Sequence, residues 1–287
     1  MSGNSTEYRA LRVGSVTGLS SILAIVMQLI TVPICLKYWG EEFYGIWLAL
    51  FALFAMLQTV GIGFVNYISN QINILYHQDQ TALQTTIASS LVGVFILAGI
   101  QFSLVVAVIG FDVLPELIGT ANSDFGPQNA NWSLLMLAGP WILVGFYLGI
   151  IHRLLIPTGM MYQSSWGVIG TQLSLFMVVI ISALSKFTLI QTSALFAFVQ
   201  LLFAIASALY IRFKLPEHYP WWRSFSFSWG LRDLLRSIPL TVSGLIQQGS
   251  SNGLVILISV VAGAAAVPVF TTVRTLTNLW TNVTNLL

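Results

Sequence analysis

Long apolar runs separated by short polar connections dominate this chain of 287 residues. A membrane-crossing helix needs about 20 mostly apolar residues, whereas a membrane-crossing strand needs only about 9–11. All the runs are too long to be strands, so we predict an all-α fold, a polytopic membrane helical bundle. The predicted spans lie near Val13–Leu36, Tyr44–Phe64, Leu83–Phe111, Trp132–Ile151, Trp166–Leu184, Thr188–Ile211, Ile238–Val261 and Ala264–Leu287.

The composition supports a membrane location. Hydrophobic residues make up 56% of the chain and charged residues only 7%, whereas soluble domains carry about 25% charged residues. So few charges cannot cover a water-exposed surface, and we expect the bilayer to be a partner of this surface. The net charge of +2 gives no support for nucleic-acid binding. The single cysteine, Cys35, excludes an intrachain disulfide and a CxxC metal site.

The placement of Lys and Arg predicts the orientation. Positive residues favour the cytoplasmic loops of membrane proteins, and most fall in connections on one side of the predicted bundle. That side holds Arg9, Arg12, Arg153, Arg212, Lys214, Arg223, Arg232 and Arg236. The other side holds only Lys37 and Lys186. We therefore predict a cytoplasmic N-terminus. The first apolar run is too long for a signal peptide and is read as a retained span.

The longest connection, Arg212 to Ser237, divides the chain into two lobes. It contains five basic residues together with Trp221, Trp222 and Trp229, which suits a headgroup-level belt. We expect a short interfacial helix beginning at Trp229. The predicted organisation is a six-helix lobe over 1–211, a basic cytoplasmic linker over 212–237, and two helices of a second lobe over 238–287. Because Leu287 lies inside an apolar run, we expect the sequence to be a fragment of a longer protein.

Polar residues form stripes on four predicted spans, the first two and the last two. On a helical wheel of about 100° per residue, Gln58, Asn66 and Asn70 share one face of the second span. Ser, Thr and Gly are common at contacts between membrane helices, so packing explains some of these positions. Stripes that include Asn, Gln and a charge favour a hydrated cavity between two lobes.

Arg274 is the most informative single residue. It lies about ten residues into its span, and no acid lies in the core of any span. An arginine at the centre of a membrane helix costs at least about 2.5–3.5 kcal/mol, so we expect it to face water or an anion. Two alternatives stay open: the span begins later, or Arg274 binds backbone carbonyls. The candidate substrate-binding residues are Arg274, Arg12, Gln28, Asn66, Asn70, Gln248 and Asn278.

The first two spans carry a recognisable motif. It runs Pro33, then Tyr38-Trp-Gly40-Glu-Glu-Phe-Tyr44-Gly45-Ile-Trp47, then Gly61-Ile-Gly63-Phe-Val-Asn66. This pattern resembles the opening of the bacterial Wzx-type O-antigen flippases, which are polysaccharide-biosynthesis proteins of the multidrug/oligosaccharidyl-lipid/polysaccharide exporter superfamily. That family has two lobes of six helices, so this chain would contain the first lobe and two helices of the second.

The resemblance implies a function, a location and partners. The protein would flip a polyprenyl-pyrophosphate-linked oligosaccharide across the bacterial inner membrane, with Arg274 and Arg12 meeting the pyrophosphate. The lipid-linked oligosaccharide would be the substrate, and a polysaccharide polymerase and chain-length machinery would be the protein partners. No cofactor and no catalytic residue is expected, since the chain has no HExxH or Walker sequence.

Three other functions stay open. A multidrug exporter of the same superfamily would be favoured by a carboxylate in the cavity, and the sequence places none there. A membrane-embedded glycosyltransferase would need an acidic loop, for which Asp112, Glu116 and Asp124 are the only candidates. A non-catalytic scaffold of a glycan-assembly complex is the third.

Overall fold

The computed structural model of the protein describes residues 3–120 and 127–284. The side chains of residues 3–17, 21, 127, 276 and 278–284 fall outside that description. Every long element in the described residues is a helix, which confirms the all-α prediction. Six segments are long and apolar enough to cross a membrane, and the first of them, Gly18–Gln78, is 61 residues long. The chain is therefore a multi-pass membrane protein.

Helix α1, Gly3–Gln78, consists of two arms joined at a single glycine. Gly40 has φ 79° and ψ 172°, a conformation that a side chain would strain and that glycine adopts readily. We call residues 3–39 the N-terminal arm and residues 41–78 the C-terminal arm. They correspond to the first two predicted spans. The aromatic rings of Trp39 and Phe43 pack across the break, with centroids 5.1 Å apart.

The next spans follow the predicted order. Helix α2 covers Gln80–Gly110, and Asp79 caps its N-terminus by accepting from two backbone N–H groups. After the short α3, Leu114–Leu117, the fourth span combines α4, Pro127–Pro140, with the π-helical turn η1, Trp141–Gly145, and α5, Phe146–His152. The 3-10 turn η2, Arg153–Leu155, leads to α6, Met161–Leu184, and then to α7, Leu189–Lys214.

The C-terminal part has one long interrupted helix and one further helix. A 3-10 turn, η3, Pro216–His218, precedes α8, Phe227–Gln248. A π-helical turn, η4, Gly249–Gly253, links α8 to α9, Leu254–Ala262, and α10 covers Ala266–Thr284. The separate interfacial helix expected at Trp229 is not formed. The Ser226 side chain caps the helix at Phe227, and no break separates those first turns from the seventh span.

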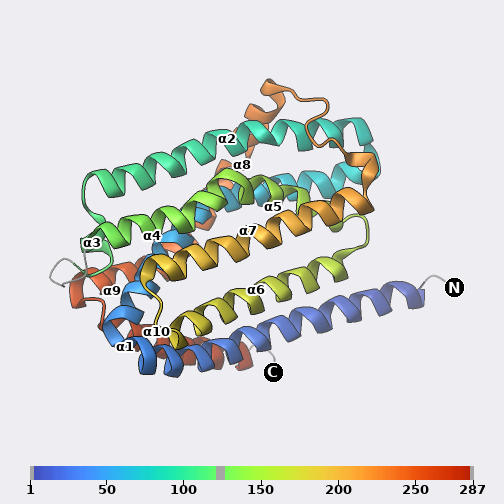
Figure 1. Ribbon diagram of the computed structural model, residues 1–287. Coiled ribbons are helices and arrows are strands. Elements are labelled where there is room, and N and C mark those ends of the chain that lie inside the picture. The colour runs from blue at the N-terminus through green and yellow to red at the C-terminus, as the bar shows by residue number, and fades with distance from the viewer. Residues whose placement is uncertain (1–2, 121–126, 285–287) are drawn as a thin grey trace.

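The helices run side by side, with the C-terminal arm at the centre. The N-terminal arm lies along one edge of the bundle beside α6 (Figure 1). The C-terminal arm supplies Phe54, Phe64, Ile68 and other fully buried side chains to the core. Helix α1 contacts α2, α4, α5, α6, α8, α9 and α10. Its second arm is therefore the element against which the rest of the bundle packs.

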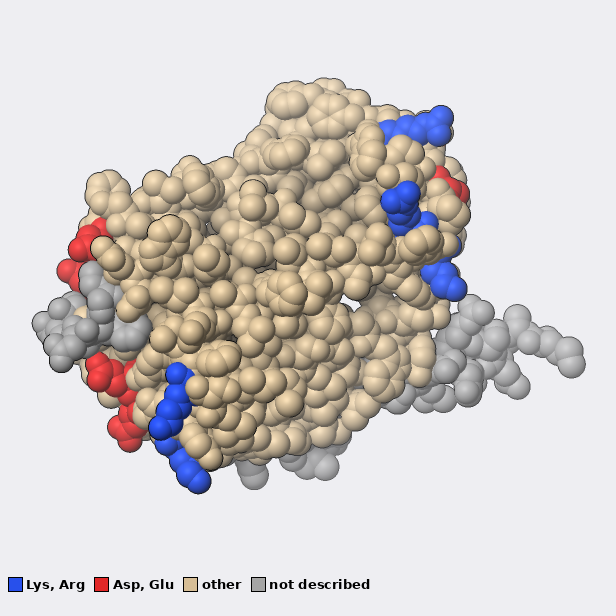
Figure 2. Space-filling view, viewed as in Figure 1, with Lys and Arg blue, Asp and Glu red and all other residues tan. Residues whose placement is uncertain are grey.

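Charged side chains gather at the two ends of the bundle. On the face shown in Figure 2, Asp and Glu lie mostly at one end, Lys and Arg lie at both ends, and an uncharged band separates the two ends. Such a band is what a bilayer requires, because charges are costly in hydrocarbon. The predicted orientation stays a prediction.

Candidate functional site

The C-terminal arm of α1 packs at very short range against α8 and against the turn that follows α9. A Cβ placed on Gly45 would lie 1.8 Å from the carbonyl oxygen of Ala264, and one on Gly63 would lie 2.3 Å from the Cα of Thr241. Ala52 of the arm is buried with Val255 of α9. The C-terminal arm and the interrupted helix α8–α9 are therefore antiparallel. They meet along a seam of small residues, as is common between membrane helices. We call Gly45, Ala52 and Gly63 with their partners the small-residue seam.

A polar cluster lies where α8 is interrupted. Within and beside the η4 turn, Asn252 Nδ2 donates to Gln248 Oε1 at 2.7 Å, and Ser251 Oγ is 3.3 Å from the same oxygen. From α10, Arg274 donates through Nη1 to the backbone carbonyl of Ser251. Its guanidinium also lies 5.9 Å from the centre of the Phe270 ring. We call Gln248, Ser251, Asn252 and Arg274 the η4 cluster.

A π-helical turn explains why a carbonyl is available there. One extra residue in the turn disrupts the regular hydrogen-bond ladder, and such turns occur frequently at functional sites. The five residues Gly249-Ser-Ser-Asn-Gly253 are small, and two of them are glycine. The sequence therefore weakens the helix at this point. Arg274 binds a carbonyl of the turn, which is one of the two alternatives that the sequence left open.

The expected substrate-binding residues do not all meet. Gln248 and Arg274 are both half-buried in the η4 cluster. Gln28, Asn66 and Asn70 are exposed, and no hydrogen bond between described residues joins them to that cluster. Arg12 and Asn278 lie outside the described side chains. The structure thus brings two of the seven candidates together and leaves the shared cavity between lobes a prediction.

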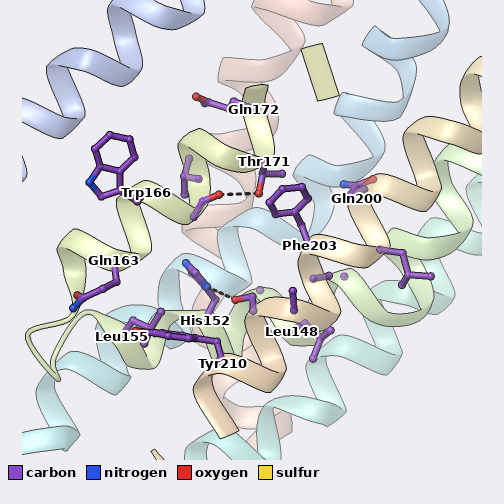
Figure 3. A pocket seen from close by; sticks show the side chains of 18 of the residues that line it. Leu148, His152, Leu155, Gln163, Trp166, Thr171, Gln172, Gln200, Phe203 and Tyr210 are labelled. Carbon is purple, nitrogen blue, oxygen red and sulfur yellow. Dashed lines mark hydrogen bonds between the residues drawn. The ribbon is translucent and has the colours of Figure 1, made fainter. Parts of the chain in front are cut away.

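A second location is a cavity of about 660 Å³ that is partly open to the outside and is lined by residues of η1, α5, α6 and α7. His152 lies in its wall, where the two ring nitrogens are 2.6 Å from Ser207 Oγ and 2.8 Å from Ser164 Oγ (Figure 3). Aromatic side chains from two helices complete the wall, among them Trp166 on α6 and Phe203 and Tyr210 on α7. We call this space the α6–α7 cavity.

Sequence reasoning missed this cavity. His152 directly follows the predicted span near Trp132–Ile151, so the sequence alone favours the membrane interface for it, whereas it is half-buried and bonded to residues of α6 and α7. Its partners Ser164 and Ser207 are 12 and 55 positions away, so no local motif links them. The only available signal was a histidine close to an apolar run, and such a residue fits an interface equally well.

A buried glutamine was also missed. Gln101 on α2 is fully buried and donates through Nε2 to the backbone carbonyl of Leu57 at 2.8 Å. It therefore fastens the third span to the C-terminal arm. Gly61 fits closely against the ring of Phe146 and Gly63 against Thr241, so the Gly61-Ile-Gly63 motif serves helix packing on both its glycines.

The described residues offer no other chemistry of the kinds considered. Among them, no group of three or more His, Cys, Asp or Glu side chains is placed to hold a metal ion. Asp112 and Glu116 are exposed near α3, and Asp124 lies outside the described residues.

Comparison of the chain with protein-family models, with curated proteins and with solved structures finds no match.

Proposed function

We propose that the protein is a membrane transporter that flips a polyprenyl-pyrophosphate-linked oligosaccharide across the bacterial inner membrane. The observation that carries this proposal is the η4 cluster. It places a guanidinium and two side-chain amides at an interruption of a membrane helix. Broken membrane helices that expose polar groups are the usual construction of transporter binding sites. The resemblance of residues 33–66 to the Wzx-type flippases supports the same substrate class.

The chemistry of the cluster suits a phosphorylated sugar. A guanidinium carries five N–H donors in a planar fork that matches phosphate oxygens, and the Ser251 carbonyl accepts from one nitrogen of Arg274. The amides of Gln248 and Asn252 can exchange their mutual hydrogen bond for bonds to sugar hydroxyls. The hydrocarbon tail of the substrate would stay in the bilayer, so only the polar headgroup needs a polar route.

Alternating access would use the two groups of helices that meet at the small-residue seam. In this proposal the substrate enters from the cytoplasmic leaflet, and relative rocking of the two groups opens the site to the other side. Asn66 and Asn70 are exposed on the C-terminal arm and would bond the glycan on its way. A polysaccharide polymerase and chain-length proteins would act on the product.

A complementation experiment tests the proposal. Bacteria that lack their own O-antigen flippase are supplied with this chain, and surface polysaccharide is measured by immunoblot alongside the protein level in the membrane. We expect display to be restored, and Arg274→Ala to reduce it by about tenfold or more, because charged hydrogen bonds contribute about 1.5–3 kcal/mol. Arg236→Ala, at an exposed position near the start of α8, is the matched control.

Two results would contradict the proposal. One is normal display in Arg274→Ala at normal protein level, which removes Arg274 from the mechanism. The other is the absence of display with well-inserted wild-type protein.

A multidrug exporter is the second candidate, favoured by a cavity volume typical of drug-sized ligands. Restored resistance to uncharged aromatic drugs, without polysaccharide display, would support that candidate instead.

A further inference from the structure

We propose that the α6–α7 cavity binds the hydrocarbon chain of a membrane lipid. The cavity lies within the membrane-crossing segments Gln128–Leu155, Met161–Leu184 and Leu189–Lys214. It is separate from the η4 cluster, and none of its lining residues belongs to that cluster. The inference also does not depend on the proposed function, since lipid binding is an equilibrium property that can be measured without transport.

The cavity is lined by the parts of α6 and α7 that lie away from the connection between these helices. Near that connection α6 buries Val178, Ile180 and Ala183, and α7 buries Leu189 and Phe196. Both helices therefore pack tightly at that end. Toward their other ends the lining residues become exposed, and a way in from the bilayer lies between α6 and α7. Exposed lining residues there are Gln163, Trp166, Val168, Ala206 and Tyr210.

The entrance is close to one surface of the membrane. Tyr210 is four positions before the C-terminal residue of α7, Lys214, and Gln163 is two positions after the first residue of α6, Met161. Trp and Tyr are enriched at this depth in membrane proteins. The cavity then extends inward to Pro140 and Gln200. A lipid chain could therefore enter while its headgroup stays at the surface.

The wall of the cavity suits hydrocarbon and not a charged or heavily hydroxylated ligand. No Lys, Arg, Asp or Glu lines it, and most of the lining surface is carbon. The most polar side chain, His152, already bonds Ser207 and Ser164 through both ring nitrogens. The Nε1 of Trp141 and the Oε1 of Gln200 are buried and have no hydrogen-bond partner among the described residues. An apolar chain loses no hydrogen bonds in such a space.

Two glycines give direct experimental control over the space. Gly149 on α5 and Gly167 on α6 both line the cavity, and a Cβ at either position would meet no atom within 4 Å. A leucine at either site would therefore occupy the cavity without displacing the backbone. Gly99 on α2 also has nothing within 4 Å, but it does not line the cavity. Gly99→Leu is the matched control.

Native mass spectrometry of the purified full chain tests the inference. Undecaprenyl phosphate and phosphatidylglycerol are added in separate titrations, and the bound fraction is measured. We expect saturable binding of one lipid, reduced about tenfold in Gly149→Leu and in Gly167→Leu and unchanged in Gly99→Leu. Loss of binding for both lipids identifies any hydrocarbon chain as the ligand, and loss for undecaprenyl phosphate alone identifies the polyprenyl chain. Unchanged binding in both cavity variants overturns the proposal.

A labelling experiment covers the case in which the leucine variants do not fold. In a Cys35→Ala background, Ala204→Cys places a thiol on the cavity wall, and Leu202→Cys places one on the exposed side of the same helix. Added lipid should slow alkylation of the cavity thiol by N-ethylmaleimide several-fold and leave the control thiol unaffected. Equal rates with and without lipid at Ala204→Cys would overturn the proposal independently of any transport result.

Discussion

Arg274 on α10 donates a hydrogen bond to the backbone carbonyl of Ser251 in the η4 turn. The bond joins the last helix to the interruption of the preceding span, and it uses the only cation that lies deep in a predicted span. A carbonyl released by a π-helical turn needs such a partner, because unpaired backbone groups in hydrocarbon are costly. The same arginine can therefore stabilise the turn in one state and meet a phosphate in another.

The first prediction concerns this bond. Arg274→Lys keeps the charge but loses the guanidinium fork, so we expect stability to fall by about 0.6–1.7 kcal/mol, the range of hydrogen bonds between membrane helices. Amide hydrogen exchange across residues 249–253 should become faster than in wild type. Arg236→Lys, whose side chain is exposed, serves as the control. Exchange that is unchanged in Arg274→Lys would show that the bond does not support the turn.

The second prediction concerns the small-residue seam. Gly63→Ala adds a Cβ that would lie 2.3 Å from the Cα of Thr241, so the backbones must separate. Overpacking of this kind costs about 1–3 kcal/mol, and thermal unfolding in detergent should show the loss. Gly99→Ala, in open space, should instead be neutral or slightly stabilising, since alanine favours helix over glycine. Equal melting temperatures for both variants would contradict the close contact.

The third prediction concerns Gln101. Its amide donates to the Leu57 carbonyl, and the side chain is fully buried. Gln101→Met keeps the volume but loses the bond, so we expect a cost of about 0.6 kcal/mol. Gln101→Glu is expected to cost more, because an ionised carboxylate would be buried beside a carbonyl oxygen. The measurement is the yield of folded protein with its thermal midpoint. A glutamate variant as stable as the methionine variant would contradict this placement.

The fourth prediction concerns pH. Burial lowers the pKa of His218 below its ordinary value of 6.5. The carboxylate of Glu217, whose Oε1 lies 3.8 Å from Nε2 of His218, partly opposes that shift. Below pH 6.5 the unfolded chain therefore binds a proton more readily than the folded chain does. The stability contributed by neutral His218 is present above that pH and is lost as pH falls through the lowered folded pKa.

The measurement is the thermal midpoint across that pH range. We expect wild type to lose stability as the medium is acidified from pH 7 toward about pH 5, and His218→Gln to lose less. Glu217→Gln removes the charge that opposes the pKa shift of His218. In this variant the loss of thermal stability should therefore occur at lower pH than in wild type. An identical pH dependence in wild type and His218→Gln would show that His218 does not control it.

The fifth prediction concerns orientation. In a Cys35→Ala background, Asp112→Cys, in the exposed turn after α2, and Arg223→Cys, in the exposed connection before α8, mark opposite ends of the bundle. If the N-terminus is cytoplasmic, a membrane-impermeant maleimide added to cells whose outer membrane has been permeabilised labels Asp112→Cys. Arg223→Cys is labelled only after the inner membrane is also opened. The reverse pattern would invert the proposed direction of transport.

The helices were predictable from the sequence because membrane spans depend on length and apolarity. Helix α7, Leu189–Lys214, begins after its Thr188 cap as expected for the span near Thr188–Ile211. By contrast, the turn expected between Lys37 and Tyr44 reduces to a single non-helical residue, Gly40. Glycine provides the needed conformation, but the flanking residues do not reveal that the helix resumes at once.

The site was less predictable because it depends on how helices cross. The π-helical turn η4 contains one extra residue, and its Ser251 carbonyl accepts a hydrogen bond from Arg274. The local composition allows such a turn but does not predict it. The α6–α7 cavity is lined by residues of several helices that are far apart in the sequence, and no stripe of polar residues indicates it. Helical wheels place Gln248 and Arg274 on polar faces, and Arg274 bonds Ser251, three positions after Gln248, yet the wheels could not show which residues of other helices those faces would touch.

The small-residue seam has one more consequence. Since the backbones of the C-terminal arm and α8 already touch near Gly63 and Thr241, neither helix can move closer to the other there. Any relative motion of the two must turn about that line of contact or slide along it. If the two helices separate on one side of this line of contact, they must therefore approach each other on the other side.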